Sequence, residues 1–153
     1  MPSGKPLILL GFDYGLKRIG VAVGQRLTGA ASALTTVEAR DGKPHWDTIA
    51  GLIGEWHPDA LVVGIPRHMD GTAHQLTEAA ERFARQLEGR FRLPTFRIDE
   101  RLSSKAAETA LAERSAERRG RQVHAKAEID KLAAQIILQS WLDSRETTHD
   151  DGN

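Results

Sequence analysis

The first 37 residues hold three apolar runs separated by short polar turns. The runs at 7–12 and 19–23 are continuously apolar; the first leads into Asp13, and Gly15 lies in the turn between them. Apolar runs of this length, bounded by turn residues, predict buried strands joined as a hairpin. The run at 28–37 carries small and β-branched residues and no charge, which predicts a third strand. Consecutive strands joined by short turns predict an antiparallel meander.

Helical and strand patterns alternate beyond this meander. Asp41 and Gly42 predict a turn, Pro44 suits the first turn of a helix, and apolar residues recur at helical spacing over 46–56. The run at 60–65 is apolar on both of its alternations. This pattern is typical of a strand that is covered on both faces, as in a parallel sheet.

A longer helix and a further strand follow. Thr72 and Gln75 fit a capping box, and the apolar stripe over 76–91 predicts a helix that packs on the core. Pro94 ends this helix, and the segment 95–98 predicts a short strand.

The last third of the chain predicts two helices joined by a basic loop. The helices are expected at about 103–113 and 127–142, and the segment 114–126 has five Lys and Arg residues against one Glu. Such a segment buries little, so we expect a mobile loop there and a polar, frayed tail at 145–153. The buried side of the last helix is predicted to hold Ile129, Leu132, Ala133, Ile136, Ile137 and Ser140.

This order of elements predicts an α/β fold. A meander followed by alternating helices and strands builds a mixed five-stranded sheet with helices on both faces. A chain of 153 residues has the size of one domain. We therefore expect a single domain over 1–153, ordered from about residue 5 to residue 144.

Composition and charge exclude several classes of protein. The chain has no cysteine, which excludes disulfides and thiolate metal sites and fits a reducing cytoplasm. No apolar run approaches the roughly 20 residues that cross a bilayer, so we expect no membrane partner and a cytoplasmic location. The net charge is zero, which argues against a protein that is basic throughout but allows a local basic face.

Three acids fall where this fold brings distant segments together. Asp13 ends the first strand, Glu100 follows the fifth, and Asp130 lies beside the apolar stripe of the last helix. If the first and fifth strands run parallel, two of these carboxylates can meet the third from a helix packed across them. Converging carboxylates repel one another unless a cation is bound, and their oxygens suit Mg²⁺ or Mn²⁺. Two such ions, roughly 3.5 to 4 Å apart, would support hydrolysis of a nucleic-acid backbone.

Four segments also carry a family resemblance. In order they are 13–22 (DYGLKRIGVA), 64–71 (GIPRHMDG), 99–104 (DERLSS) and 126–142 (KAEIDKLAAQIILQSWL). Together they resemble the successive motifs of the YqgF/RuvX family, over essentially the whole chain. The resemblance implies a ribonuclease-H-like fold and a nuclease. That nuclease either matures the 5′ end of pre-16S ribosomal RNA or resolves Holliday junctions in branched DNA.

The resemblance also implies which residues form the site. Matching the motifs gives Asp13, Glu100 and Asp130 as the catalytic, metal-binding acids. Asp99 is adjacent to Glu100 and would project to the opposite face of a strand. Only one of these two acids should reach the metal, and we favour Glu100.

Cations near these acids are candidates for binding the substrate backbone. Lys17 and Arg18 lie on the turn nearest the first acid, where a solvated surface cation is the equal alternative. Arg101 either contacts phosphate or pairs with a neighbouring acid, and Lys126 either binds substrate or forms an ion pair one helical turn along. The cations of the basic loop would track a phosphate backbone, and they are Arg114, Arg118, Arg119 and Arg121.

Two other classes of protein stay open. Sugar kinases and actin-like ATPases also hold ATP phosphates with an acid–glycine hairpin, but they close two domains over the nucleotide and this chain has the length of one. A ribosome-assembly factor that binds rRNA without turnover is the other class. The sequence leaves open RNA against DNA as the substrate. It also leaves open monomer against homodimer, since a junction resolvase needs two sites for two strands.

Overall fold

The computed structural model describes residues 8–68, 70–102 and 122–152, with the side chains of residues 8–68, 70–100 and 128–144. The predicted helix at 103–113 and residues 114–121 of the basic loop lie outside the described residues. The described elements are β1 (Ile8–Asp13), β2 (Arg18–Gln25), β3 (Ala30–Arg40), β4 (Lys43–Pro44), α1 (Trp46–Trp56), β5 (Ala60–His68), α2 (Thr77–Phe91), β6 (Thr95–Leu102) and α4 (Gln122–Gly152).

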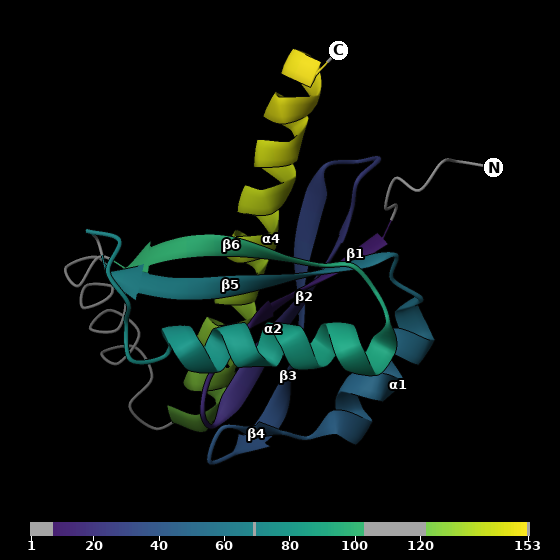
Figure 1. Ribbon diagram of the computed structural model, residues 1–153. Helices are drawn as coiled ribbons and strands as arrows, with labels where there is room; N and C mark the ends of the chain where they lie inside the picture. The colour runs from purple at the N-terminus through teal and green to yellow at the C-terminus, as the bar shows by residue number, and fades with distance from the viewer. Residues whose placement is uncertain (1–7, 69, 103–121, 153) are drawn as a thin grey trace.

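A mixed sheet lies between two layers of helices (Figure 1). Its strand order is β4-β3-β2-β1-β5-β6. The first three strands form the predicted antiparallel meander, and β1, β5 and β6 run parallel. Helices α1 and α2 cover one face, and α4 covers the other. Among the described residues, none of the helices combines the length and apolar character needed to cross a membrane.

The sheet has six strands rather than the five predicted. The additional strand, β4, is a two-residue edge strand that pairs with the end of β3. A tight turn makes this pairing, because Asp41 (φ 53°) and Gly42 (φ 80°) both adopt positive φ angles, as hairpin turns require. Pro44 therefore lies in an edge strand, where its missing N–H is tolerated, and α1 begins only after His45 caps it.

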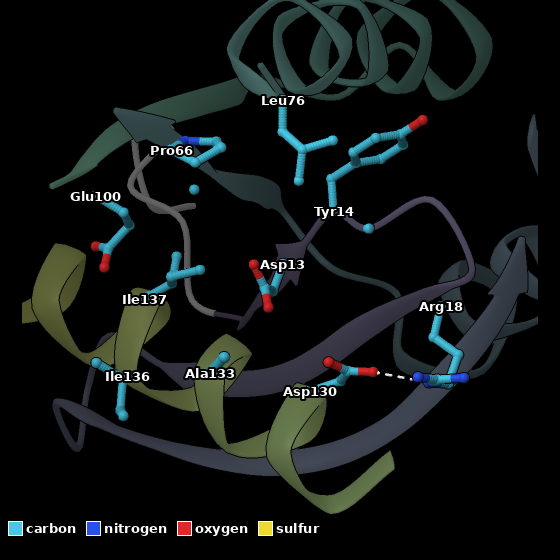
Figure 2. Close-up of a pocket in the computed structure, with 12 residues that line it drawn as sticks. Asp13, Tyr14, Arg18, Pro66, Leu76, Glu100, Asp130, Ala133, Ile136 and Ile137 are labelled. Atoms are coloured by element: carbon cyan, nitrogen blue, oxygen red, sulfur yellow. Dashed lines mark hydrogen bonds and ion pairs between the residues drawn. The ribbon is translucent and has the colours of Figure 1, made fainter. Parts of the chain in front are cut away.

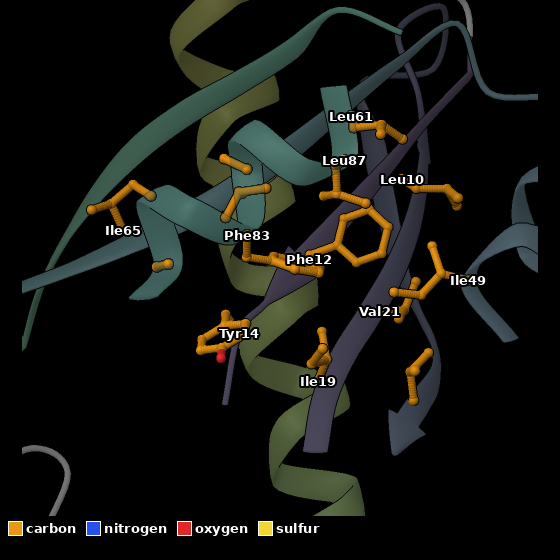
Figure 3. Packing of buried hydrophobic residues seen from close by; sticks show 14 residues of the cluster. Leu10, Phe12, Tyr14, Ile19, Val21, Ile49, Leu61, Ile65, Phe83 and Leu87 are labelled. Carbon is orange, nitrogen blue, oxygen red and sulfur yellow. The ribbon is translucent and has the colours of Figure 1, made fainter. Parts of the chain in front are cut away.

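Alternation along β1 assigns its residues to the two faces of the sheet. Leu10 and Phe12 pack toward α1 and α2, whereas Leu9 packs toward α4. The buried residues on the α1 and α2 side form the larger of two hydrophobic clusters, shown in Figure 3. In it, the ring of Phe83 of α2 lies 5.7 Å from that of Phe12 and 5.2 Å from that of Tyr14. The same alternation directs Asp13 to the α4 face, where the second, smaller cluster lies.

The beginning of α2 differs from its prediction. The helix starts at Thr77, and its N-cap residue, Leu76, makes no side-chain capping bond, so the predicted capping box is wrong. Thr77 instead donates its hydroxyl to the Pro66 carbonyl in β5, at 2.5 Å, and accepts from the His74 amide at 2.7 Å. A long-range contact therefore replaces the local cap. The predicted apolar stripe is confirmed, with Phe83 among its buried residues.

Helix α4 begins earlier than predicted, continues to Gly152 instead of ending at about residue 142, and buries a somewhat different face. Residues 122–126, predicted as the end of the basic loop, are helical; they include neither glycine nor proline to stop the helix. Ile136, predicted to be buried, is 60% exposed. Compared with the predicted buried side, the observed one is shifted by about one residue towards the C-terminus. The buried residues in the described part of α4 are Ala134, Ile137, Leu138, Trp141 and Leu142.

Candidate active site

One cleft receives the three acids that the sequence singles out. Asp13 lies at the end of β1, Glu100 near the end of the parallel strand β6, and Asp130 on α4. All three line a cleft of about 430 Å³ (Figure 2). In Figure 2 the Asp13 carboxylate lies between the other two. The parallel pairing of β1, β5 and β6 brings the ends of these strands together, as the order of elements predicted.

The acids interact electrostatically. The pKa of Asp13 is raised to about 7, first by burial and then by the negative charges of Asp130 and Glu100. The pKa of Glu100 is also raised, because the side chain is partly buried. No hydrogen bond or ion pair to the Asp13 carboxylate is found within the described part of the chain. The Asp13 carboxylate is therefore buried beside two other acids.

Arg18 pairs with one of these acids, Asp130. Its Nε atom donates to Oδ2 of Asp130 at 3.0 Å, and the two side chains are 29% and 26% exposed. The dashed line in Figure 2 marks this pair at the edge of the cleft. The sequence offered Lys126 as the ion-pair partner of Asp130, and the side chain of Lys126 lies outside what the structure describes.

The two adjacent acids of β6 are separated by the pleat of the strand. Glu100 lines the cleft, whereas Asp99 projects away from it and accepts from Nε of Arg67 at 3.2 Å. The side chain of Asp99 is 55% exposed in this pair. The two side chains therefore lie on opposite faces of the strand, as its pleat predicted, and the assignment of Glu100 rather than Asp99 to the metal stays a prediction.

Close approach of α4 to the sheet narrows the cleft. Gly64 of β5 lies under Ile137, and a Cβ atom at Gly64 would lie 2.9 Å from Cγ1 of Ile137 and 3.3 Å from Cγ of Glu100. A side chain at Gly64 would therefore force Ile137 to move. Gly64 and Pro66, both from the motif at 64–71, line the cleft.

Apolar residues form the rest of the cleft wall. The wall includes Tyr14 directly after β1, Leu76 directly before α2, and Ile137 of α4. The Tyr14 hydroxyl donates to the Gly42 carbonyl at 2.6 Å, and burial raises its pKa. Sequence reasoning missed Tyr14. Its position directly after Asp13, where the side chain points to the opposite face of the sheet, could have indicated it.

The predicted substrate-binding cations have different outcomes. Arg18 lines the acid cleft, and Lys17 lines the cleft next to it. The backbones of Arg101 and Lys126 lie in β6 and α4, but their side chains lie outside the described set. The remaining predicted cations are all outside the described residues, and they are Arg114, Arg118, Arg119 and Arg121.

The cleft contains the donor chemistry of a divalent-cation site. Among the described residues, no three side chains of His, Cys, Asp or Glu are grouped closely enough to form a metal site as they stand, and Asp130 is turned to Arg18. The donors nevertheless fit a hard cation, because they are carboxylates, and burial followed by repulsion from the other two acids raises the pKa of Asp13. Asp13, Glu100 and Asp130 are the described residues that can hold such an ion.

Comparison with known proteins identifies the family. The family model RuvX, described as Holliday junction resolvase, matches residues 7–144. The chain belongs to the RuvX family. A protein of Pseudomonas aeruginosa named "Putative pre-16S rRNA nuclease" is 49% identical over 143 residues, which cover 93% of this chain and 96% of the relative. A protein of Legionella pneumophila with the same name is 49% identical over 146 residues, covering 95% and 100%. Membership of the RuvX family assigns the chain to the nucleases, which hydrolyse phosphodiester bonds.

A solved structure agrees with the fold. The crystal structure of the fowlpox virus Holliday junction resolvase has a TM-score of 0.52 and 13% identity to this RuvX chain, and the match covers 90% of this chain and 99% of the other. At this level of identity the likeness concerns the fold alone. It supports the ribonuclease-H-like architecture that the strand order already shows.

Proposed function

We propose that this RuvX protein is a metal-dependent nuclease that matures the 5′ end of pre-16S ribosomal RNA. The convergence of Asp13, Glu100 and Asp130 on one cleft, with Arg18 at its edge, carries the proposal. Relatives named for pre-16S rRNA and 49% identical to the chain support the choice of substrate. The cation is Mg²⁺ or Mn²⁺, and we infer two ions at the three carboxylates.

The acids, Arg18 and the apolar wall of the cleft have different roles in this chemistry. When bound, the divalent cations supply an activated water and neutralise charge on the scissile phosphate. Asp13, Glu100 and Asp130, in their ionised forms, would hold the cations. The Arg18 guanidinium has five N–H donors, so it can bind a phosphate oxygen while it keeps a bond to Asp130. The apolar wall that includes Leu76 excludes water on one side, which strengthens the electrostatic interactions inside.

A direct cleavage assay tests the proposal. Purified protein is incubated with a 5′-extended 16S precursor fragment and Mg²⁺ or Mn²⁺, and the product ends are mapped. We expect cutting at the 5′ extension, and a loss on the order of 10³-fold or more in Asp13→Asn, because one metal-binding carboxylate is removed. The matched control is Asp47→Asn, which neutralises an exposed acid in the first turn of α1 and should cut like wild type.

Full activity of Asp13→Asn, or full activity after rigorous chelation of divalent cations, would contradict a metal-dependent nuclease. Precursor binding with no product from the wild-type protein would favour an rRNA-binding assembly factor instead.

Resolution of branched DNA is the second candidate, favoured by the description of the matching family. A four-way DNA junction in the same assay separates the two substrates. Symmetric cleavage of the junction with an intact RNA precursor would favour the resolvase.

A further inference from the structure

We propose that a basic cleft beside the acids holds the phosphate backbone of the nucleic-acid strand that is cut. This inference rests on the nuclease function proposed above and names the surface on which the substrate lies. The basic cleft has a volume of about 520 Å³ and is built from β2, β3, β4 and the turn before β2. Its charged and imidazole-bearing lining residues are Lys17, Arg18, Glu38, Arg40, Lys43 and His45.

Positive charge concentrates in this cleft although the chain as a whole is neutral. Four of the lining residues are Lys or Arg, and only Glu38 is acidic. Three of the four cations, Lys17, Arg40 and Lys43, are exposed and have no ion-pair partner within 4.0 Å in the described part of the chain. Unpaired cations around a concave surface raise the local concentration of an anionic ligand.

The hairpin of β3 and β4 fixes two of these cations opposite each other. Arg40 and Lys43 are cross-strand partners on either side of the two-residue turn at Asp41 and Gly42. Directly opposed residues of an antiparallel pair lie on the same face, and like charges in these positions repel. An anion bound between the two side chains would relieve that repulsion. The pair is therefore arranged for a phosphate rather than for stability.

The hairpin is tied to the turn that follows Asp13. The Tyr14 hydroxyl donates to the Gly42 carbonyl at 2.6 Å, and the Gly42 amide donates to the Leu16 carbonyl at 3.0 Å. The Ala39 amide also donates to the Lys17 carbonyl at 2.9 Å. These bonds hold the basic cleft at a fixed position relative to the acids.

Arg18 joins the basic cleft to the acid cleft, because it lines both. A backbone that lies along Lys43, Arg40 and Lys17 would reach Arg18 next and then the three acids. Lys and Arg bind phosphates whatever the base sequence. The basic cleft would thus position the strand without selecting its sequence. RNA and DNA share this chemistry, so both backbones should bind.

Binding measured in an inactive background tests the inference. Two proteins are compared: Asp13→Asn alone, and Asp13→Asn that also carries Arg40→Gln and Lys43→Gln. Fluorescence anisotropy measures their binding to a labelled single-stranded RNA of the 5′ extension. We expect the dissociation constant at low salt to rise about tenfold or more, and the slope of log K against log salt to fall by about 1.4 for two lost phosphate contacts.

The matched control is Arg85→Gln/Arg92→Asn, which removes two exposed cations near α2, with asparagine at Arg92 because that residue has a φ of 55°. The control should bind RNA with the parent slope. A labelled single-stranded DNA run in parallel should lose affinity to the same extent.

The two proposals fail in different ways. If wild type cuts the precursor but Arg40→Gln/Lys43→Gln binds with unchanged affinity and salt dependence, the basic cleft is overturned and the nuclease function stands. If wild type cuts nothing but the basic-cleft variant loses RNA affinity as expected, the basic cleft stands and the proposed catalysis is overturned. Circular dichroism of each variant confirms that the fold is kept.

Discussion

The backbone of Asp130 lies directly against Gly20. A Cβ atom built on Gly20 would overlap the Asp130 carbonyl oxygen and lie 3.3 Å from its Cα atom. Gly20 is also the cross-strand partner of Asp13 in the β1–β2 pair. The missing side chain of one strand residue therefore sets how closely α4 brings Asp130 to Asp13.

Gly20→Ala should push α4 away from the sheet at Asp130. Overpacking of this kind typically lowers the free energy of unfolding by 1–3 kcal/mol. A displacement of about 1 Å at a catalytic group can reduce the rate about 10²-fold, so cutting should fall further than stability explains. Urea unfolding and cleavage rates on the same preparation measure both effects. Gly54→Ala in α1 is the control, because nothing lies within 4 Å of its added Cβ and alanine favours the helix. Wild-type cutting by a stable Gly20→Ala protein would contradict this account of Asp130.

Neutralising the two acids at the end of β6 should affect the cutting rate to very different extents. Glu100→Gln removes a carboxylate from the cleft and should lower the cutting rate on the order of 10²-fold or more. Asp99→Asn alters only an exposed pair with Arg67, which is worth about 0–1 kcal/mol, so cutting should stay near wild type. The two substitutions are at adjacent positions and each removes one negative charge, so each is the other's control. Strong loss in Asp99→Asn with activity in Glu100→Gln would reverse the assignment.

The placement of the acids could be predicted because it depends on short-range periodicity. Alternation along β1 and β6 fixes the faces of Asp13 and Glu100, and parallel strands bring their carboxyl ends together. Helical spacing likewise places Asp130 on the side of α4 that contains Ala134 and Ile137. Each of these inferences needs only the period of one element and the order of the elements.

The features that sequence reasoning missed depend on contacts between distant segments. The pair of Arg18 and Asp130 requires the depth at which α4 packs on Gly20, which no local pattern contains. The start of α2 is set by the bond from Thr77 to Pro66, 11 residues away. The strand β4 has only two residues, too few to show a period.

Arg18 should weaken metal binding but speed up cutting of the substrate. Its guanidinium occupies Oδ2 of Asp130 and adds positive charge beside the acids. Arg18→Ala should therefore bind Mn²⁺ more tightly, as measured by calorimetry, although it cuts RNA more slowly because a phosphate donor is lost. Arg18→Lys keeps the charge but not the planar set of guanidinium N–H donors, so it should restore metal affinity to the wild-type value and restore cutting only in part. Weaker Mn²⁺ binding by Arg18→Ala would contradict competition at Asp130.

The raised pKa of Asp13 predicts how stability depends on pH when no metal is bound. Asp13 titrates near its ordinary value of 3.8 when the chain is unfolded and at about 7 when it is folded. Between these values the folded state binds more protons, so this group makes the free energy of unfolding fall as pH rises, by up to roughly 1.4 kcal/mol per pH unit. Asp13→Asn lacks this pH-dependent contribution to stability. In chelator, the stability of the variant relative to wild type should increase by on the order of 2 kcal/mol from pH 5 to pH 8, measured by urea unfolding. Added Mg²⁺ at pH 8 should reduce the difference, because the cation stabilises the ionised acids of wild type. Parallel pH profiles for the two proteins would show that Asp13 titrates normally in the fold.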